Sequence, residues 1–245
     1  MSQSKVSRIE TGRLLPSVLD VHQWLDALAA DNATRDELLT LARLANAEYQ
    51  DVRASVRRGL HLRQRELAAL EANARQMRHF LPALITGLLQ TPDYMRAAMT
   101  APVEPATADL ARTIALKTAR QAVLHDQAKH FEFLLTENAL RWRLCAPPVL
   151  AAQIDHLASV SRLPNIRIGV LPFSAEVPDG AYHTFVVYDR KLVTAELFTG
   201  QLVLRDPKDI DHYRELFDFF AARALWDDDA RDLLADAASA FRKGK

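Results

Sequence analysis

Cysteine, glycine and long apolar runs are scarce in this chain of 245 residues, and each scarcity excludes a class of protein. The single cysteine, Cys145, excludes an internal disulfide framework and fits a reducing, cytoplasmic compartment. No apolar run is long enough to span a bilayer, so we expect no membrane partner. With only 7 glycines, the chain is expected to be rich in helix.

The chain has no net charge, and it lacks the usual sequence signatures of catalysis and metal binding. Lys plus Arg and Asp plus Glu balance at 31 each, so no global basic field favours nucleic acid, although a local patch would suffice for binding. The histidines lack metal-ligand spacing, since His125 and His130 are five residues apart. No glycine loop for phosphate and no nucleophile elbow occurs. We therefore expect no metal, no cofactor and no enzyme.

The first dozen residues predict a short helix over 2–11 with an unusual polar surface. Ser2 is a good N-cap, Val6 and Ile9 share one buried stripe, and Gly12 suits the left-handed turn that ends a helix. The remaining surface carries Gln3, Ser4, Lys5, Ser7 and Arg8. Such donors and acceptors can contact base edges in the major groove. Spacing alone also fits an ordinary amphipathic helix.

The string SQSKVSRIETGR resembles the recognition helix of Cro/repressor-type (XRE family) helix-turn-helix proteins. The resemblance implies contacts to double-stranded DNA. It places Gln3, Ser4 and Arg8 against bases, and Lys5, Ser7 and Arg13 against bases or phosphate. It gives Glu10 an internal structural bond. The family places two helices before this one, whereas only Met1 precedes it here. We therefore expect either a start at an internal methionine or a loss of autonomous DNA binding.

The next stretch predicts the remainder of the helical domain and a connector. Helices beginning near Ser17 and Thr34 match the last two of the five repressor-type helices, which gives a partial DNA-binding domain over 1–47. Residues 48–80 are expected to form a helical connector, because Leu67, Leu70, Ala74, Met77 and Phe80 follow helical spacing. Its arginines between 49 and 65 either hold DNA phosphates or pair with acids elsewhere.

Residues 81–245 are predicted to form an α+β regulatory or interaction domain. We therefore expect the chain as a whole to be α+β and mainly α. Strands are expected over 131–135, 166–173, 182–188 and 192–198, the last two joined as a hairpin. Helices fill most of the remainder. The predicted sheet is small and mostly antiparallel.

Five strings in this order resemble the C-terminal, antitoxin-like domain of WhiJ-like actinobacterial XRE-family regulators. They are GLLQTPDY (87–94), ARQAVL (119–124), LTENALR (135–141), LPNIRIGVLPFS (163–174) and DHYRELF (211–217). The resemblance implies a transcriptional regulator that works with a small partner protein, and no established catalysis. A homodimer is also compatible with it.

Candidate ligand or partner residues cluster near 141–143. Arg141, Trp142 and Arg143 could clamp an anionic or aromatic ligand, or could simply anchor a strand end. Tyr94 is a further candidate. Glu137 and Arg141 have the i,i+4 spacing of a helix ion pair rather than an acid–base dyad. The favoured function is a DNA-binding regulator with an effector- or partner-sensing domain. The alternative is an interaction module that binds a small protein without DNA.

Overall fold

The computed structural model describes residues 2–51, 60–100 and 110–244. Three helices come first: α1 (Gln3–Glu10), α2 (Val18–Ala27) and α3 (Asn32–Asn46). Ser2, Ser17 and Asp31 cap them, and Ser17 forms a capping box with Asp20. Gly12 (φ 67°) ends α1, with the amides of Gly12 and Arg13 bonded to the carbonyls of Ile9 and Arg8. This Schellman motif is the predicted helix stop.

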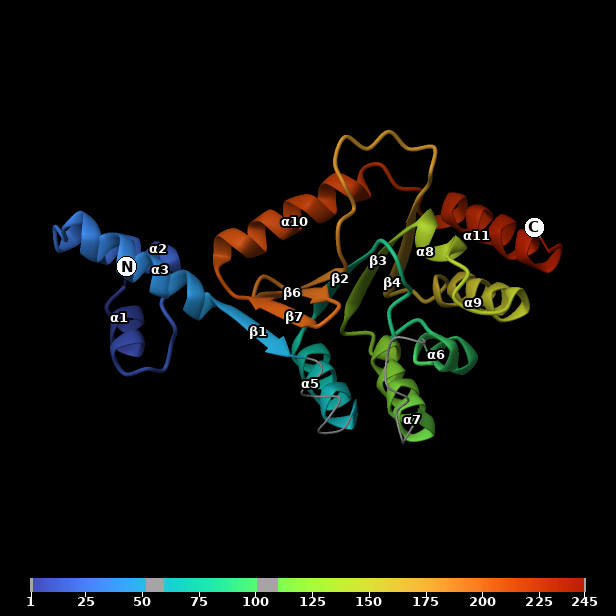
Figure 1. Cartoon of the computed structure of the whole chain (residues 1–245), viewed down its shortest axis with the longest axis horizontal. Coiled ribbons are helices and arrows are strands. Elements are labelled where there is room, and N and C mark those ends of the chain that lie inside the picture. The colour runs from blue at the N-terminus through green and yellow to red at the C-terminus, as the bar shows by residue number, and fades with distance from the viewer. Residues whose placement is uncertain (1, 52–59, 101–109, 245) are drawn as a thin grey trace.

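A seven-stranded mixed sheet forms the centre of the described body (Figure 1). Its strands are β1 (Ala47–Asp51), β2 (Gln76–Leu81), β3 (His130–Thr136), β4 (Ile166–Leu171), β5 (Phe185–Tyr188), β6 (Leu192–Leu197) and β7 (Gly200–Leu204). They lie in the order β1-β7-β6-β5-β2-β3-β4. Pairs from β1 to β2 are antiparallel, whereas β2, β3 and β4 run parallel. The predicted α+β, mainly helical class and the predominance of antiparallel pairing are confirmed.

Helices cover both faces of this sheet. They are α5 (Leu60–Asn73), α6 (Pro92–Ala98), α7 (Leu110–Arg120), the 3₁₀ helix η1 (Gln121–His125), α8 (Glu137–Arg141), α9 (Pro147–Val160), α10 (Pro207–Ala221) and α11 (Asp227–Arg242). In Figure 1, α10 lies on one side of the sheet, and α5 and α7 lie on the other. Among the described residues, no helix is both long and apolar enough to cross a membrane.

The alternation of side chains along the strands divides the core into two. Met77, Phe133 and Val186 belong to the larger cluster, which includes α9 and α11. Phe80 and Phe185 point to the opposite face, where they pack with α10. Because both faces are covered by apolar side chains, β2 is buried on both sides, as a central strand should be.

The predicted helical connector over 48–80 is wrong at both ends. Its first residues belong to β1, and the helix expected over 64–80 stops at Asn73 before β2 begins at Gln76. The apolar spacing that suggested one helix arises because alternate β2 residues enter two different cores. Residues 52–59, including Arg53, Arg57 and Arg58, lie outside the described part of the chain.

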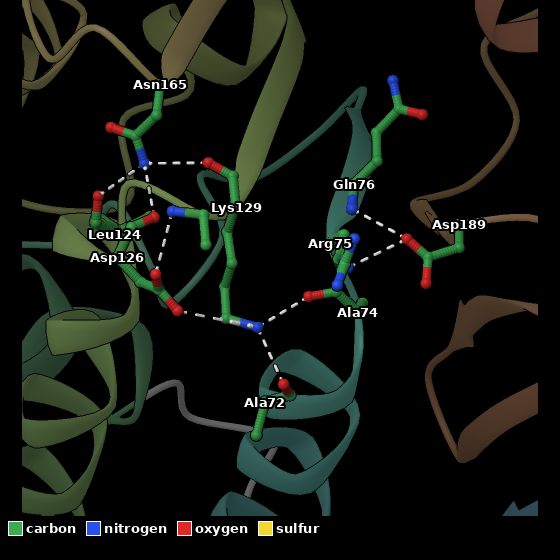
Figure 2. A network of polar contacts seen from close by, with 10 residues as sticks. Ala72, Ala74, Arg75, Gln76, Leu124, Asp126, Lys129, Asn165 and Asp189 are labelled. Atoms are coloured by element: carbon green, nitrogen blue, oxygen red, sulfur yellow. Dashed lines mark hydrogen bonds and ion pairs between the residues drawn. The ribbon is translucent and has the colours of Figure 1, made fainter.

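Polar side chains fix the point where α5 gives way to β2 (Figure 2). The ammonium of Lys129 donates to the carbonyls of Ala72 and Ala74, at 2.8 and 2.7 Å. The carboxylate of Asp189 accepts the amides of Arg75 and Gln76, at 3.0 and 2.8 Å. A cation on the last carbonyls of a helix stabilises its end, so these contacts end α5 and start β2.

Candidate functional site

Helix α1 lies on the surface, and none of its residues is buried. Gln3, Ser4, Ser7 and Arg8 are exposed, as is Arg13 just beyond the helix. Within the described residues, their side chains make no ion pair or hydrogen bond to another side chain. The N-terminal half of the helix therefore presents amide, hydroxyl and guanidinium groups to solvent, the groups that bond base edges and phosphates.

Lys5 differs from the other predicted DNA-contacting residues, because it has a partner inside the protein. Its ammonium lies 2.6 Å from Oδ1 of Asp20, whose side chain is 6% exposed. Burial alone would raise the pKa of Asp20, but hydrogen bonds from Lys5 and Ser17 outweigh it and lower that pKa. The structure thus gives Lys5 the role of joining α1 to α2.

The segment that contains α2 and α3 exposes several leucines. Its exposed leucines are Leu15, Leu19, Leu28, Leu38, Leu41 and Leu44. Other apolar residues of α2 and α3 are buried, namely Leu25, Leu39 and Ala42.

The four candidate ligand residues fall in two separate places. Tyr94 is fully buried in α6, and burial raises the pKa of its hydroxyl to about 12. It is a core residue in this structure. Arg141, Trp142 and Arg143 follow one another at the end of α8, where Trp142 is 58% exposed. Arg141 Nε lies 2.5 Å from Glu137 Oε1, which is the predicted i,i+4 ion pair.

An open groove of about 340 Å³ lies beside this ion pair, at the carboxyl ends of the three parallel strands. Its lining comprises Pro82, Thr136, Asn138, Leu171, Pro172, Phe173, Ala175, Val177 and Ala181. Glu137 connects the groove to Arg141, because its second oxygen accepts the amide of Phe173 at 2.8 Å. The carboxyl ends of parallel strands are the usual ligand position in such sheets. Sequence reasoning missed the groove, because strand direction decides which loops meet.

A second site forms where two of the sequence strings meet, GLLQTPDY and ARQAVL. The side-chain amide of Gln121 donates to the carbonyls of Gly87 and Gln90, at 3.0 and 2.7 Å. The ammonium of Lys117 donates to Gln90 Oε1 at 3.1 Å. A Cβ on Gly87 would lie 3.0 Å from Arg120 Nη2 and from Lys117 Cε. Glycine at position 87 therefore lets two cations from α7 pass close to the backbone.

Among the residues that the structure describes, no group of three or more His, Cys, Asp or Glu side chains could hold a metal ion. The exposed polar surface of α1, the groove and the site at Gly87 are therefore the candidate functional features among the described residues.

Comparison with solved structures finds distant likenesses, which include the following three proteins. A phospholipase D family member, Nuc from Salmonella typhimurium, is 11% identical, covers 66% of this chain and 90% of its own, and has a TM-score of 0.38. NucT from Helicobacter pylori is 12% identical over 73% and 97% of the two chains, with a TM-score of 0.40. TrmBL2, an archaeal chromatin protein, is 14% identical over 83% and 65%, with a TM-score of 0.36. These likenesses are too distant to carry a function to this chain.

No curated protein matches the sequence. Two family models do. A helix-turn-helix domain model matches residues 1–38, which contain α1 and α2. A second model, described as a domain of unknown function (DUF5753), matches residues 64–236, which is most of the chain. The chain therefore belongs to the DUF5753 family and carries a helix-turn-helix segment in front of that domain.

Proposed function

We propose that this protein is a sequence-specific DNA-binding transcriptional regulator of the XRE, WhiJ-like type, in which α1 enters the major groove. One observation supports the proposal above all: no residue of α1 is buried, and Gln3, Ser4 and Arg8 are exposed to solvent. A buried α1 would have removed these groups from any partner. The helix-turn-helix match over residues 1–38 supports the same function.

The body would act as the sensing part of the regulator, in the cytoplasm, and by binding rather than catalysis. The open groove at the carboxyl ends of β2, β3 and β4 supports this part of the proposal, since Phe173 (66% exposed) and Trp142 (58% exposed) are large apolar side chains available to a small partner protein. A homodimer on a palindromic operator is the arrangement that helix-turn-helix regulators use most often.

The DNA-reading role is tested by selecting an operator from a random duplex library with the full-length protein, and then measuring affinity for it. Arg8→Ala should weaken binding to the selected sequence by about 1–3 kcal/mol, which is the value of one bidentate base contact. The same change should reduce discrimination against a duplex altered at the contacted base.

Arg96→Ala is the matched control, because Arg96 is an exposed arginine on α6 whose ion pair, in the part of the chain that the structure describes, is with Asp93 three residues away. Its affinity for the operator should equal that of the unmutated protein. Equal affinities for Arg8→Ala and Arg96→Ala would remove the base-reading role from α1. If the unmutated protein selects no duplex at all, the partner-binding module is the better description of this chain.

A further inference from the structure

Five polar residues interact between α5, α7 and the sheet, and we call them the inner charge cluster: Glu71, His79, Lys117, Arg120 and Tyr188. Arg120 pairs with Glu71, lies with Lys117 against Gly87, and acts through its charge on His79 and Tyr188. Glu71 comes from α5, Lys117 and Arg120 from α7, and His79 and Tyr188 from the neighbouring strands β2 and β5. None of them was singled out by sequence reasoning. The groove and the exposed surface of α1 lie elsewhere in the fold and share no residue with the cluster.

Several atoms of this cluster are buried without a hydrogen-bond partner among the described residues. The side chains of Arg120 and Glu71 are 7% and 3% exposed, and Nε of Arg120 lies 3.4 Å from Oε2 of Glu71. Nε and Nη1 of Arg120, Oε2 of Glu71 and both ring nitrogens of His79 make no hydrogen bond. Buried polar atoms are almost always satisfied in native proteins, so unpaired donors in one place indicate a missing ligand.

The charges of the cluster are unbalanced in the positive direction. Lys117 and Arg120 both lie against Gly87, so their cationic groups are neighbours. Burial and then the charge of Arg120 lower the pKa of Lys117 to about 8. Glu71 offsets one cation only in part, since burial raises its pKa to about 7. The ammonium of Lys129 adds positive potential nearby, while Glu196 acts on Lys117 in the opposite sense.

The unpaired charged atoms are the Nε and Nη1 donors of Arg120 and the Oε2 acceptor of Glu71, and the excess of positive charge decides the chemistry of the missing ligand. A guanidinium has no acceptor, and an ammonium has three donors of which Gln90 uses one. An anionic oxygen is the ligand group that best matches clustered N–H donors with an excess of positive charge. Lys117 is only partly buried, so it lies at the side of the cluster that solvent can reach.

We propose that the inner charge cluster binds an anionic oxygen group of a small molecule, a carboxylate or a phosphate, between Arg120, Lys117 and His79. Such a ligand would join α5, α7 and β2 through one set of hydrogen bonds. It would be the effector of the regulator, and in that respect the inference rests on the proposed function. Binding itself requires no DNA, so it is measured separately.

The experiment titrates sodium phosphate and sodium acetate, in separate arms, into the full-length protein at constant ionic strength with chloride as background. Binding is followed by calorimetry and by the ring ¹⁵N shifts of His79, assigned with His79→Gln. We expect saturable binding in one arm, accompanied by a shift of the His79 resonances. Saturation by phosphate only, or by acetate only, identifies which oxygen anion the cluster accepts.

Lys117→Gln should weaken binding at least about tenfold, because it removes one of two cations without removing the deeper Arg120–Glu71 ion pair. Arg96→Gln should leave binding unchanged, since Arg96 lies on the surface of α6. Arg120→Gln should abolish binding, and Lys117→Gln keeps the test decisive if the deeper variant fails to fold.

Two results would overturn the inference. One is the absence of saturable binding of either anion by the unmutated protein, and the other is equal binding by Lys117→Gln and Arg96→Gln. Operator selection and anion titration are independent measurements. A protein that binds its operator but neither anion refutes only this inference, and a protein that binds the anion but no duplex refutes only the DNA-reading role.

Discussion

Glu71 and His79 are buried in the same cluster, yet burial acts on their charges in opposite directions. Loss of solvent disfavours the charged form of each group, so it raises the pKa of Glu71 from 4.5 to about 7 and lowers the pKa of His79 from 6.5 to about 3. The positive charge of Arg120 counteracts the first shift and reinforces the second. Both groups therefore favour the neutral form over a wide range of pH.

These shifts predict two separable effects on stability. Glu71 has the higher pKa in the folded state, so the stability that it contributes is complete below pH 4.5 and is lost as pH rises towards 7. Glu71→Gln should therefore gain about 1–3 kcal/mol relative to the unmutated protein between pH 4.5 and 7. His79 has the lower pKa in the folded state, so its contribution is present above pH 6.5 and is lost as pH falls towards 3. His79→Gln should remove this loss of stability at acid pH.

Urea unfolding from pH 4 to 8 measures how the free energy of unfolding of each variant differs from that of the unmutated protein at each pH. Glu176→Gln is the control, because Glu176 is exposed and its substitution should give a flat difference. Parallel curves for Glu71→Gln and the unmutated protein would contradict the burial of an unneutralised carboxyl group in this cluster.

Single residues were predicted well where the chemistry is local. Ser2, Ser17 and Gly12 act through neighbours a few positions away, and the predicted caps and helix stop are present. Partners that are distant in sequence could not be predicted. The Lys5–Asp20 ion pair spans 15 positions, and the inner charge cluster draws its members from four separate elements.

At the scale of elements, prediction failed where a strand is covered on both faces or lies at an edge. β2 has apolar residues on both sides, which removes the alternation that identifies a strand. β1 reads AEYQD, a polar sequence that pairs only with β7 at the edge of the sheet. β3, β4 and β6 were predicted near their true positions because apolar runs and turn residues bound them.

Asn165 shows how one side chain holds several elements together (Figure 2). Its amide donates to the carbonyls of Leu124, Asp126 and Lys129, at 3.1, 3.2 and 3.2 Å, and it is 5% exposed. Asn165→Ala would leave buried carbonyls without a donor, so we expect a loss of about 2–3 kcal/mol in the free energy of unfolding.

Asn73→Ala provides the matched comparison. Asn73 also donates to a carbonyl, that of Ala69, but it is exposed and water can replace the bond. Its loss should cost less than about 1 kcal/mol in the same urea titration. Similar losses in the two variants would show that the Asn165 contacts contribute little to joining η1, β3 and β4.

At the scale of the whole molecule, the helical segment and the body are joined by a short set of contacts. β1 continues directly from α3 and pairs with β7, while the amide of Arg205 donates to the carbonyl of Asn46 at 3.2 Å. Asn46 in turn donates to the carbonyl of Pro16 at 2.9 Å. A conformational change in the body could therefore be transmitted to the N-terminal helices through β1, β7 and the start of α10.

Asp206 is the most informative residue in this connection. One carboxylate oxygen caps α10 by accepting the amide of Lys208 at 2.9 Å, and the other accepts the amide of Val18, the first residue of α2, at 3.0 Å. Asp206→Ala should cost about 0.5–2 kcal/mol as a lost helix cap. It should also release the start of α2 from the body, which faster hydrogen exchange at the Val18 amide would report.

Asp31→Ala distinguishes a lost cap from a lost connection, because Asp31 caps α3 through Thr34 and makes no hydrogen bond or ion pair with the body among the described residues. Both variants should lose similar stability, but only Asp206→Ala should accelerate exchange at Val18. If the body controls DNA binding through this contact, the anion that binds the inner charge cluster should change operator affinity in Asp31→Ala and lose that effect in Asp206→Ala. Unchanged coupling in Asp206→Ala would leave the β1–β7 pairing and the Arg205–Asn46 hydrogen bond as the route between the body and α1 among the described residues.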